Sequence, residues 1–177
     1  WMIEHYDHYR KALMLEPRGH HDMFGAFICE PIDPQADFAV YFIDTGGWLN
    51  MCGHCTIGAV TVAVETGMVE AKEPFTEVVM EAPAGIIRTV AEVKDGKVLN
   101  VTLTNVPAFL YKRDQKITVD GKEITFDISF GGSFFALVDT DKMGLVDEIN
   151  AKSVPFLADL GMKMMEIINR DFEIQHP

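Results

Sequence analysis

The stretch Asn50-Met51-Cys52-Gly53-His54-Cys55-Thr56-Ile57-Gly58-Ala59 decides the fold, because within it a turn passes into an apolar helix. The turn Thr45-Gly46-Gly47 precedes it, and small and apolar residues continue beyond it to Glu65. This composition predicts a helix over 52–65 that ends near Gly67. Because such a helix has almost no polar face, we expect it to be buried at the centre of the fold.

The segments on both sides of this helix predict strands and two further helices. Helical spacing of apolar residues covers 2–15, and two runs rich in β-branched and aromatic residues cover 24–29 and 38–44. After the central helix we expect strands over 78–81, 86–93, 98–104 and 124–129, another apolar run over 134–138, and an amphipathic helix over about 150–170. This order predicts an α+β protein of two related units, the second of them incomplete.

Composition and charge exclude several classes of protein. The 177 residues are 48% hydrophobic and 24% charged, which is typical of a globular chain. Fifteen Lys and Arg stand against 27 Asp and Glu, a net charge of −12, and so acidic a surface repels phosphate. We therefore expect no nucleic-acid partner. No apolar run is long enough to span a membrane, and the start does not resemble a signal peptide. We expect a cytoplasmic protein with free thiols.

Cys52 is the side chain most suited to chemistry. A thiol at the start of a helix faces unpaired backbone N–H groups and the positive end of the helix dipole. Both favour the thiolate and predict a pKa below the free value of about 8.5. The same N–H groups can hold a carboxylate. The combination suits removal of a proton from a carbon next to a carboxylate. The alternative is that Cys52 is one more small buried apolar residue.

Cys52 and Cys55 also form a Cys-x-x-Cys pair, which is typical of thiol-disulfide oxidoreductases. Those proteins commonly have a Trp directly before the first cysteine, whereas Met51 stands there and Trp48 lies four residues back. No Pro is placed like their cis-Pro loop. The dithiol function remains an alternative of a different class.

A metal site is a third interpretation of the same residues. Cys52 and Cys55, together with His20 and His21, could supply four zinc ligands. A closed zinc site usually brings a second pair of closely spaced ligands, and Cys29 alone does not provide one. We expect no metal.

Four segments resemble a known family in sequence and in order. They are Pro17-Arg18-Gly19-His20-His21-Asp22-Met23-Phe24-Gly25-Ala26, Gly47-Trp48-Leu49-Asn50-Met51-Cys52-Gly53-His54, Met80-Glu81-Ala82-Pro83-Ala84-Gly85 and Asn105-Val106-Pro107-Ala108-Phe109-Leu110. Together they resemble the proline racemase family, over essentially the whole chain. The family includes proline racemases, 4-hydroxyproline epimerases and trans-3-hydroxyproline dehydratases, and its members use neither pyridoxal phosphate nor a metal.

The resemblance implies the fold of diaminopimelate epimerase. That fold has two pseudo-symmetric α+β domains, each a curved, mostly antiparallel sheet wrapped around a central helix. Residues 1–118 would form most of the first domain, and residues 119–177 the incomplete start of the second. Complete members are roughly twice as long, so the chain resembles their N-terminal half.

The resemblance also implies a mechanism with two cysteine bases. Cys52 matches the thiolate that removes the α-proton of proline, while a second thiol delivers a proton to the opposite face. The backbone N–H groups of Gly53 and His54 match those that hold the substrate carboxylate. Phe24 matches the aromatic residue that packs on the pyrrolidine ring, a position that tends to be polar in hydroxyproline epimerases.

Two departures from the family pattern affect these expectations. Cys55 stands where the family usually has Asn or Gly; oxidation could pair it with Cys52, and we expect it to be a bystander under reducing conditions. The second catalytic cysteine, in an Asp-Arg-Ser-Pro-Cys-Gly-Thr-Gly element, has no counterpart here, and Cys29, expected in the core, has none of its flanks. We therefore expect the isolated chain to be inactive, with the missing half as a partner and a homodimer as a further form of association.

Overall fold

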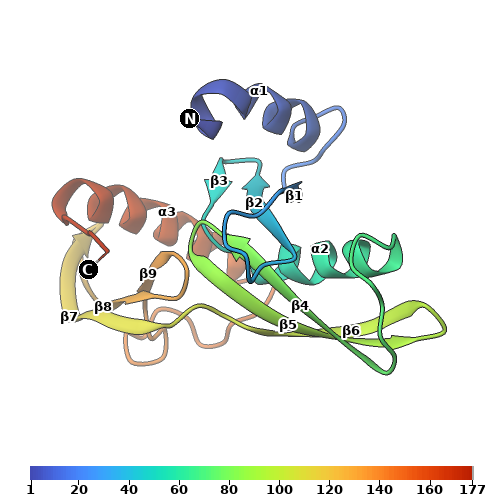
Figure 1. The fold of residues 1–177 in the computed structure, drawn as a ribbon. Coiled ribbons are helices and arrows are strands. Elements are labelled where there is room, and N and C mark those ends of the chain that lie inside the picture. The colour runs from blue at the N-terminus through green and yellow to red at the C-terminus, as the bar shows by residue number, and fades with distance from the viewer. Residues whose placement is uncertain (177) are drawn as a thin grey trace. The chain divides into compact units, whose positions relative to one another are not determined.

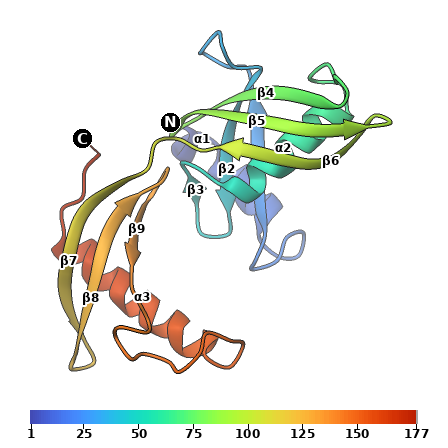
Figure 2. The ribbon, with the colours of Figure 1, turned by 90° about the horizontal axis from the view of Figure 1, so that it is seen from below.

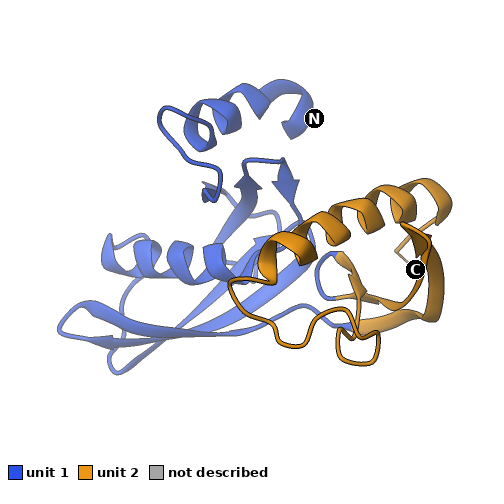
Figure 3. Cartoon of the chain, turned by 180° about the vertical axis from the view of Figure 1, so that it is seen from behind, with its two compact units in different colours: residues 1–108, 131–133 blue, residues 109–130, 134–177 orange. Residues whose placement is uncertain are grey.

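The computed structural model describes residues 1–176, which form two compact units (Figure 3). Unit 1 comprises residues 1–108 and 131–133, and unit 2 comprises residues 109–130 and the segment from 134 onward. The expected domain border after residue 118 falls inside a strand of unit 2 and stays a prediction. Among residues 1–176, each helix is too short or too polar to span a lipid bilayer.

A mixed sheet and helix α2 form the body of unit 1. The strands are β1 (Phe24–Cys29), β2 (Phe38–Asp44), β3 (Trp48–Leu49), β4 (Phe75–Ala82), β5 (Gly85–Lys94) and β6 (Lys97–Thr104). They are ordered β1-β2-β4-β5-β6, with β3 on β2, and the described pairs are antiparallel except β2 with β4. Figure 2 shows α2 (Gly53–Glu65) lying along this sheet. The strands predicted here are confirmed, and β3 is an addition too short to show a pattern.

Helix α2 buries only one of its faces. The residues on the inner face are Cys55, Thr56, Ala59, Val60, Ala63 and Val64. On the outer face Ile57 is 42% exposed and Val62 is 51% exposed. The expectation of a wholly buried helix was therefore wrong for half of its surface. An apolar composition indicates that a helix avoids water, but the sheet covers α2 from one side only.

Helix α1 (Met2–Met14) lies beside β2 and β3 in Figure 1 and confirms the first predicted helix. It buries Arg10 and Met14. The side chain of Met14 packs over Gly25 of β1, where an added Cβ would lie 2.8 Å from the Met14 Cε. A glycine at 25 thus permits the close approach of this helix to the sheet.

Unit 2 repeats the combination of an antiparallel sheet and a helix. Strands β7 (Phe109–Val119), β8 (Lys122–Phe130) and β9 (Phe134–Leu137) pair in that order, and α3 (Val154–Asp171) follows. Its core contains Ile117, Val119, Ile124, Phe126, Ile128, Met164 and Ile168. Helix α3 begins four residues later than expected because Pro155 suits the first turn of a helix and not its interior.

Strand β7 is the long strand that the sequence did not predict. Its register with β8 shifts twice, between Leu110 and Lys112 and again between Lys112 and Gln115. Asp114, inside the second shift, has a φ of 53°. Bulges of this kind break the alternation of inward and outward side chains on which strand prediction depends.

Candidate active site

Cys52 is the N-cap of α2. Its backbone is extended, with φ −146° and ψ 110°, and its Sγ accepts a hydrogen bond from the backbone N–H of Cys55 at 3.4 Å. Its carbonyl oxygen accepts two more, from the N–H and the Oγ1 of Thr56, both at 2.9 Å. These bonds fix the thiol at the first turn of the helix, where the sequence expected it.

The backbone N–H groups of Gly53 and His54 point out of the same helix end. Among residues 1–176 no acceptor takes either of them, as expected for the first turn of a helix. A Cβ added at residue 53 would meet only Leu103, at an ordinary 3.8 Å, so packing within the chain does not require glycine there. The two N–H groups can therefore bind an anion next to the Cys52 thiol.

Phe24 and His54 come together from different elements. Phe24 begins β1 and is 43% exposed, and its ring centroid lies 6.0 Å from that of His54, with the rings tilted by 56°. An open groove of about 500 Å³ runs between β1 and α2. Its lining includes Phe24, Ile28, His54, Cys55, Ile57 and Val62. Cys52 is not part of this lining, so the groove adjoins the helix start without containing the thiol.

The other two cysteines differ from Cys52 in their surroundings. Cys55 is only 9% exposed, and its pKa is raised to about 12, first by burial and then by the neighbouring Cys52, with a smaller contribution from Asp44. It is therefore a neutral thiol near pH 7. Cys29 at the end of β1 is only half-buried, contrary to the expected core position, and burial also raises its pKa.

The comparisons with known proteins place this chain in a family. The family model described as proline racemase matches residues 1–177. The chain belongs to the proline racemase family. This confirms the resemblance carried by the segment around Cys52.

Similar proteins within the family are named as different enzymes. A proline racemase of Clostridioides difficile is 53% identical and aligns with all of this chain and 52% of its own length. A trans-3-hydroxy-L-proline dehydratase of Bacillus thuringiensis is 40% identical over the whole chain, again with 52% of its own length. The chain thus spans about half the length of the curated relatives it matches.

A solved relative supports the fold assignment. The structure of a hydroxyproline epimerase from Agrobacterium vitis, with bound trans-4-OH-L-proline, superposes with a TM-score of 0.90 at 34% identity. The match covers 97% of this chain and 50% of the epimerase. The expected diaminopimelate-epimerase-like fold, with a curved and mostly antiparallel sheet around a helix, is confirmed.

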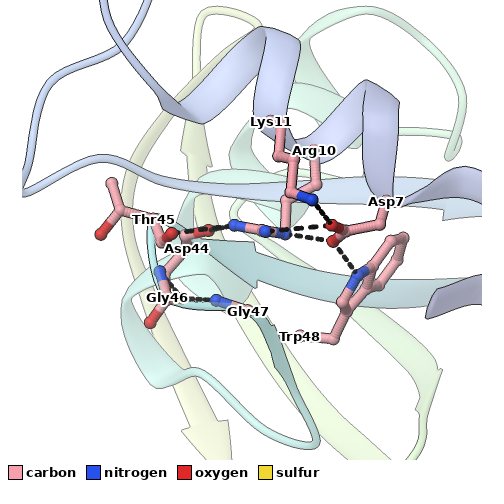
Figure 4. A network of polar contacts seen from close by, with 8 residues as sticks. All are labelled: Asp7, Arg10, Lys11, Asp44, Thr45, Gly46, Gly47 and Trp48. Atoms are coloured by element: carbon pink, nitrogen blue, oxygen red, sulfur yellow. Dashed lines mark hydrogen bonds and ion pairs between the residues drawn. The ribbon is translucent and has the colours of Figure 1, made fainter.

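In this family member a polar network holds the turn that leads to Cys52 (Figure 4). The guanidinium of Arg10 donates to the carbonyl oxygens of Asp44 and Thr45, both at 2.9 Å. Its Nε donates to Asp7 at 2.6 Å, and the indole N–H of Trp48 donates to the same carboxylate at 3.0 Å. Helix α1 is thereby tied to both sides of the turn between β2 and β3.

The two carboxylates of this network, Asp44 and Asp7, accept hydrogen bonds from different groups. Asp44 Oδ1 accepts the N–H groups of Gly46 and Gly47, at 2.8 and 2.6 Å, and so closes the turn. Hydrogen bonds from Arg10, Lys11 and Trp48 hold the pKa of Asp7 far below its ordinary range. Arg10, Asp7 and Asp44 were not among the residues predicted from the sequence, although Asp followed by Thr-Gly-Gly is typical of a turn closed by a carboxylate.

Gly132 supports the same segment from another side. Its φ is +102°, and an added Cβ would lie 2.4 Å from the Cβ of Met51. Asn105 holds the loop by donating from Nδ2 to the carbonyl oxygen of Gly131 at 3.0 Å. Gly132 thus permits close packing against Met51, the residue before Cys52.

The metal interpretation gains no support from the described residues. Within 1–176 no three side chains of His, Cys, Asp or Glu are grouped so that they could hold an ion. His21 instead lies 3.3 Å from the exposed carboxylate of Asp22, and His20 Nδ1 accepts the N–H of Asp22. The two histidines belong to an exposed turn.

Proposed function

We propose that this chain supplies one half of the active site of a cofactor-independent proline racemase. The observation that carries the proposal is that Cys52 caps α2 while the N–H groups of Gly53 and His54 next to it remain open. A base and an anion site then adjoin each other, in a chain of the proline racemase family. An α-amino acid presents the two matching groups, a carboxylate and an acidic α-hydrogen.

In the proposed reaction the Cys52 thiolate removes the α-proton from one face of proline. The electron pair left on the α-carbon delocalises into the carboxylate, whose growing negative charge the N–H groups of Gly53 and His54 stabilise. A second thiol, contributed by the remaining half of the protein, returns a proton to the opposite face. One proton leaves and one enters, so the reaction needs no redox change.

Two activities of the same family are the alternatives for the substrate and the outcome. A 4-hydroxyproline epimerase would use the same pair of bases, and a trans-3-hydroxyproline dehydratase would need only one cysteine, with Thr in place of the other. The exposed apolar ring of Phe24 beside His54 favours the unsubstituted pyrrolidine ring of proline.

The dithiol oxidoreductase is the alternative of another class. It would require Cys52 and Cys55 to exchange disulfides with other proteins, whereas the chain belongs to the proline racemase family. Reduction of insulin by the chain would favour it. A homodimer and a cytoplasmic setting remain predictions.

The test joins residues 1–177 to the C-terminal half of the Clostridioides difficile proline racemase, giving a hybrid enzyme. We expect the hybrid to abolish the optical rotation of L-proline, the Cys52→Ser hybrid to leave it unchanged, and the 177-residue chain alone to be inactive because it covers only one face of the α-carbon. A hybrid that unfolds cooperatively yet does not act on proline contradicts the proposal.

A further inference from the structure

The chain has a second nucleophilic group that the proposed reaction does not use, the thiol of Cys55. It sits in the first turn of α2, three residues after Cys52, and its own N–H donates to the Cys52 sulfur at 3.4 Å. A Cys-x-x-Cys pair at a helix N-terminus is the arrangement that redox-active disulfides use. The sequence match to a proline racemase leaves this pairing without a role.

The two thiols differ in their exposure to solvent. Cys52 is half-buried and open enough to meet a small oxidant, while Cys55 lies beneath it at 9% exposure. The backbone N–H of Cys55 donates to the Cys52 sulfur and holds it at the start of the helix. The outer thiol is therefore the one expected to be oxidised first, and the inner thiol is placed to react with the product.

We propose that Cys52 and Cys55 form a site of reversible oxidation by hydrogen peroxide, in which Cys55 converts oxidised Cys52 into an intrahelical disulfide. Cys52 attacks one peroxide oxygen; the S–O bond forms, the O–O bond breaks, and the hydroxide released takes a proton to become water. The Cys55 sulfur then attacks the sulfenic sulfur of Cys52. The S–S bond forms, the S–O bond breaks, and the thiol proton leaves with the hydroxyl group as water.

The two oxidation steps balance in atoms and in electrons. Two thiols and one hydrogen peroxide give one disulfide and two waters, with sulfur oxidised and peroxide reduced. The neutral state of Cys55 does not prevent the second step. Burial is the main cause of the raised pKa of Cys55 and a negative charge on Cys52 is the second, and this second cause disappears once Cys52 is a neutral sulfenic acid.

The disulfide would have two consequences. It would stop oxidation of Cys52 before the irreversible sulfinic acid, and a reductant would restore both thiols. It would also remove the proposed base, because a disulfide sulfur cannot take up a proton. This second consequence rests on the proposed function, whereas the first does not.

The test treats the 177-residue chain with equimolar hydrogen peroxide, blocks free thiols by alkylation and maps the peptides. Cleavage on the amino side of aspartates separates Cys29, in residues 22–32, from the pair, in residues 44–94. We expect the 44–94 peptide to lose two hydrogens and both alkylation sites, and to regain them with dithiothreitol. We expect the 22–32 peptide to stay reduced and alkylated.

Two variants keep the inference falsifiable. With excess hydrogen peroxide, Cys29→Ala should behave as the original chain, whereas Cys55→Ala should accumulate two or three oxygens on Cys52 that dithiothreitol does not remove. Sulfinic acid on Cys52 of the original chain with Cys55 still free would overturn the inference, and so would a pair that stays reduced or a disulfide between two chains. Far-UV circular dichroism checks that each variant is folded.

The hybrid enzyme separates this inference from the proposed function. An active hybrid should lose its racemase activity with peroxide and recover it with dithiothreitol, whereas its Cys55→Ala variant should not recover. A hybrid without racemase activity would count against the proposed function, while the peptide masses would still decide on the disulfide.

Discussion

The backbone N–H of Cys55 donates to the sulfur of Cys52 at 3.4 Å, so the third residue of α2 holds the side chain that caps the helix. The same first turn leaves the N–H groups of Gly53 and His54 open. One turn of helix therefore carries the proposed base, the proposed anion site and a second thiol, and each of these can be examined separately.

Cys52 and Cys55 should differ in their reactivity toward iodoacetamide at neutral pH. The pKa of Cys55 is raised to about 12, so its thiolate is scarce, and we expect alkylation at Cys52. In Cys52→Ala the neighbouring charge is lost and the reactivity of Cys55 should rise. Peptide mapping of residues 44–94 measures both, and preferential alkylation of Cys55 in the original chain would contradict the assignment.

Replacing Cys55 with Gly should leave the racemase activity of the hybrid enzyme intact under reducing conditions. Cys55 is buried below the helix start and has no part in the proposed proton transfers. The measurement is the rate of loss of optical rotation from L-proline in dithiothreitol. Abolished activity in a folded Cys55→Gly hybrid would show that the second thiol takes part in catalysis.

Gly53→Ala should separate stability from substrate binding. Residue 53 opens the helix and has room for a Cβ, so the change should leave the free energy of unfolding unchanged or raise it by up to about 1 kcal/mol. The added methyl group would crowd a carboxylate on the adjacent N–H groups and raise KM in the hybrid. Gly58→Ala, elsewhere on the outer face of α2, is the matched control. An unchanged KM for Gly53→Ala would argue against the carboxylate site.

Phe24→Ser should shift the preference of the hybrid from proline toward 4-hydroxyproline. The ring is 43% exposed, and a Ser hydroxyl group in its place can form a hydrogen bond with the hydroxyl group of 4-hydroxyproline. The ratio of kcat/KM for the two substrates measures the effect, with Phe24→Leu as the apolar control. If both variants change the ratio equally, the polarity of residue 24 does not set the preference.

Asp7 should contribute stability that is lost in acid. Its folded pKa lies below the ordinary value of 3.8, so its contribution is complete above about pH 4 and falls as protonation proceeds below that. Asp7→Asn should therefore lower the unfolding temperature at neutral pH and flatten its decline on acidification. Asp22→Asn, which alters an exposed carboxylate, should leave the slope unchanged. Equal slopes for Asp7→Asn and the original chain would contradict this.

Local patterns were sufficient for most elements and for the centre of the site. Apolar spacing located α1 and α2 to within about two residues, and the position of Cys52 followed from the passage of a turn into a helix. Strand β7 was not predicted because its two register shifts break the alternation of inward and outward side chains. Whether such shifts are tolerated depends on the facing strand β8.

The sequence by itself determined the family, the α+β class and the thiol at the start of a helix, because these depend on residue order and on hydrogen bonds within a single turn. Only the tertiary structure decided what surrounds that thiol. Arg10 reaches Asp44 across 34 positions of the chain, and Phe24 meets His54 across 30. It also decided that α2 is buried on one side only. Burial is set by the elements that pack against a helix, and its own composition does not specify them.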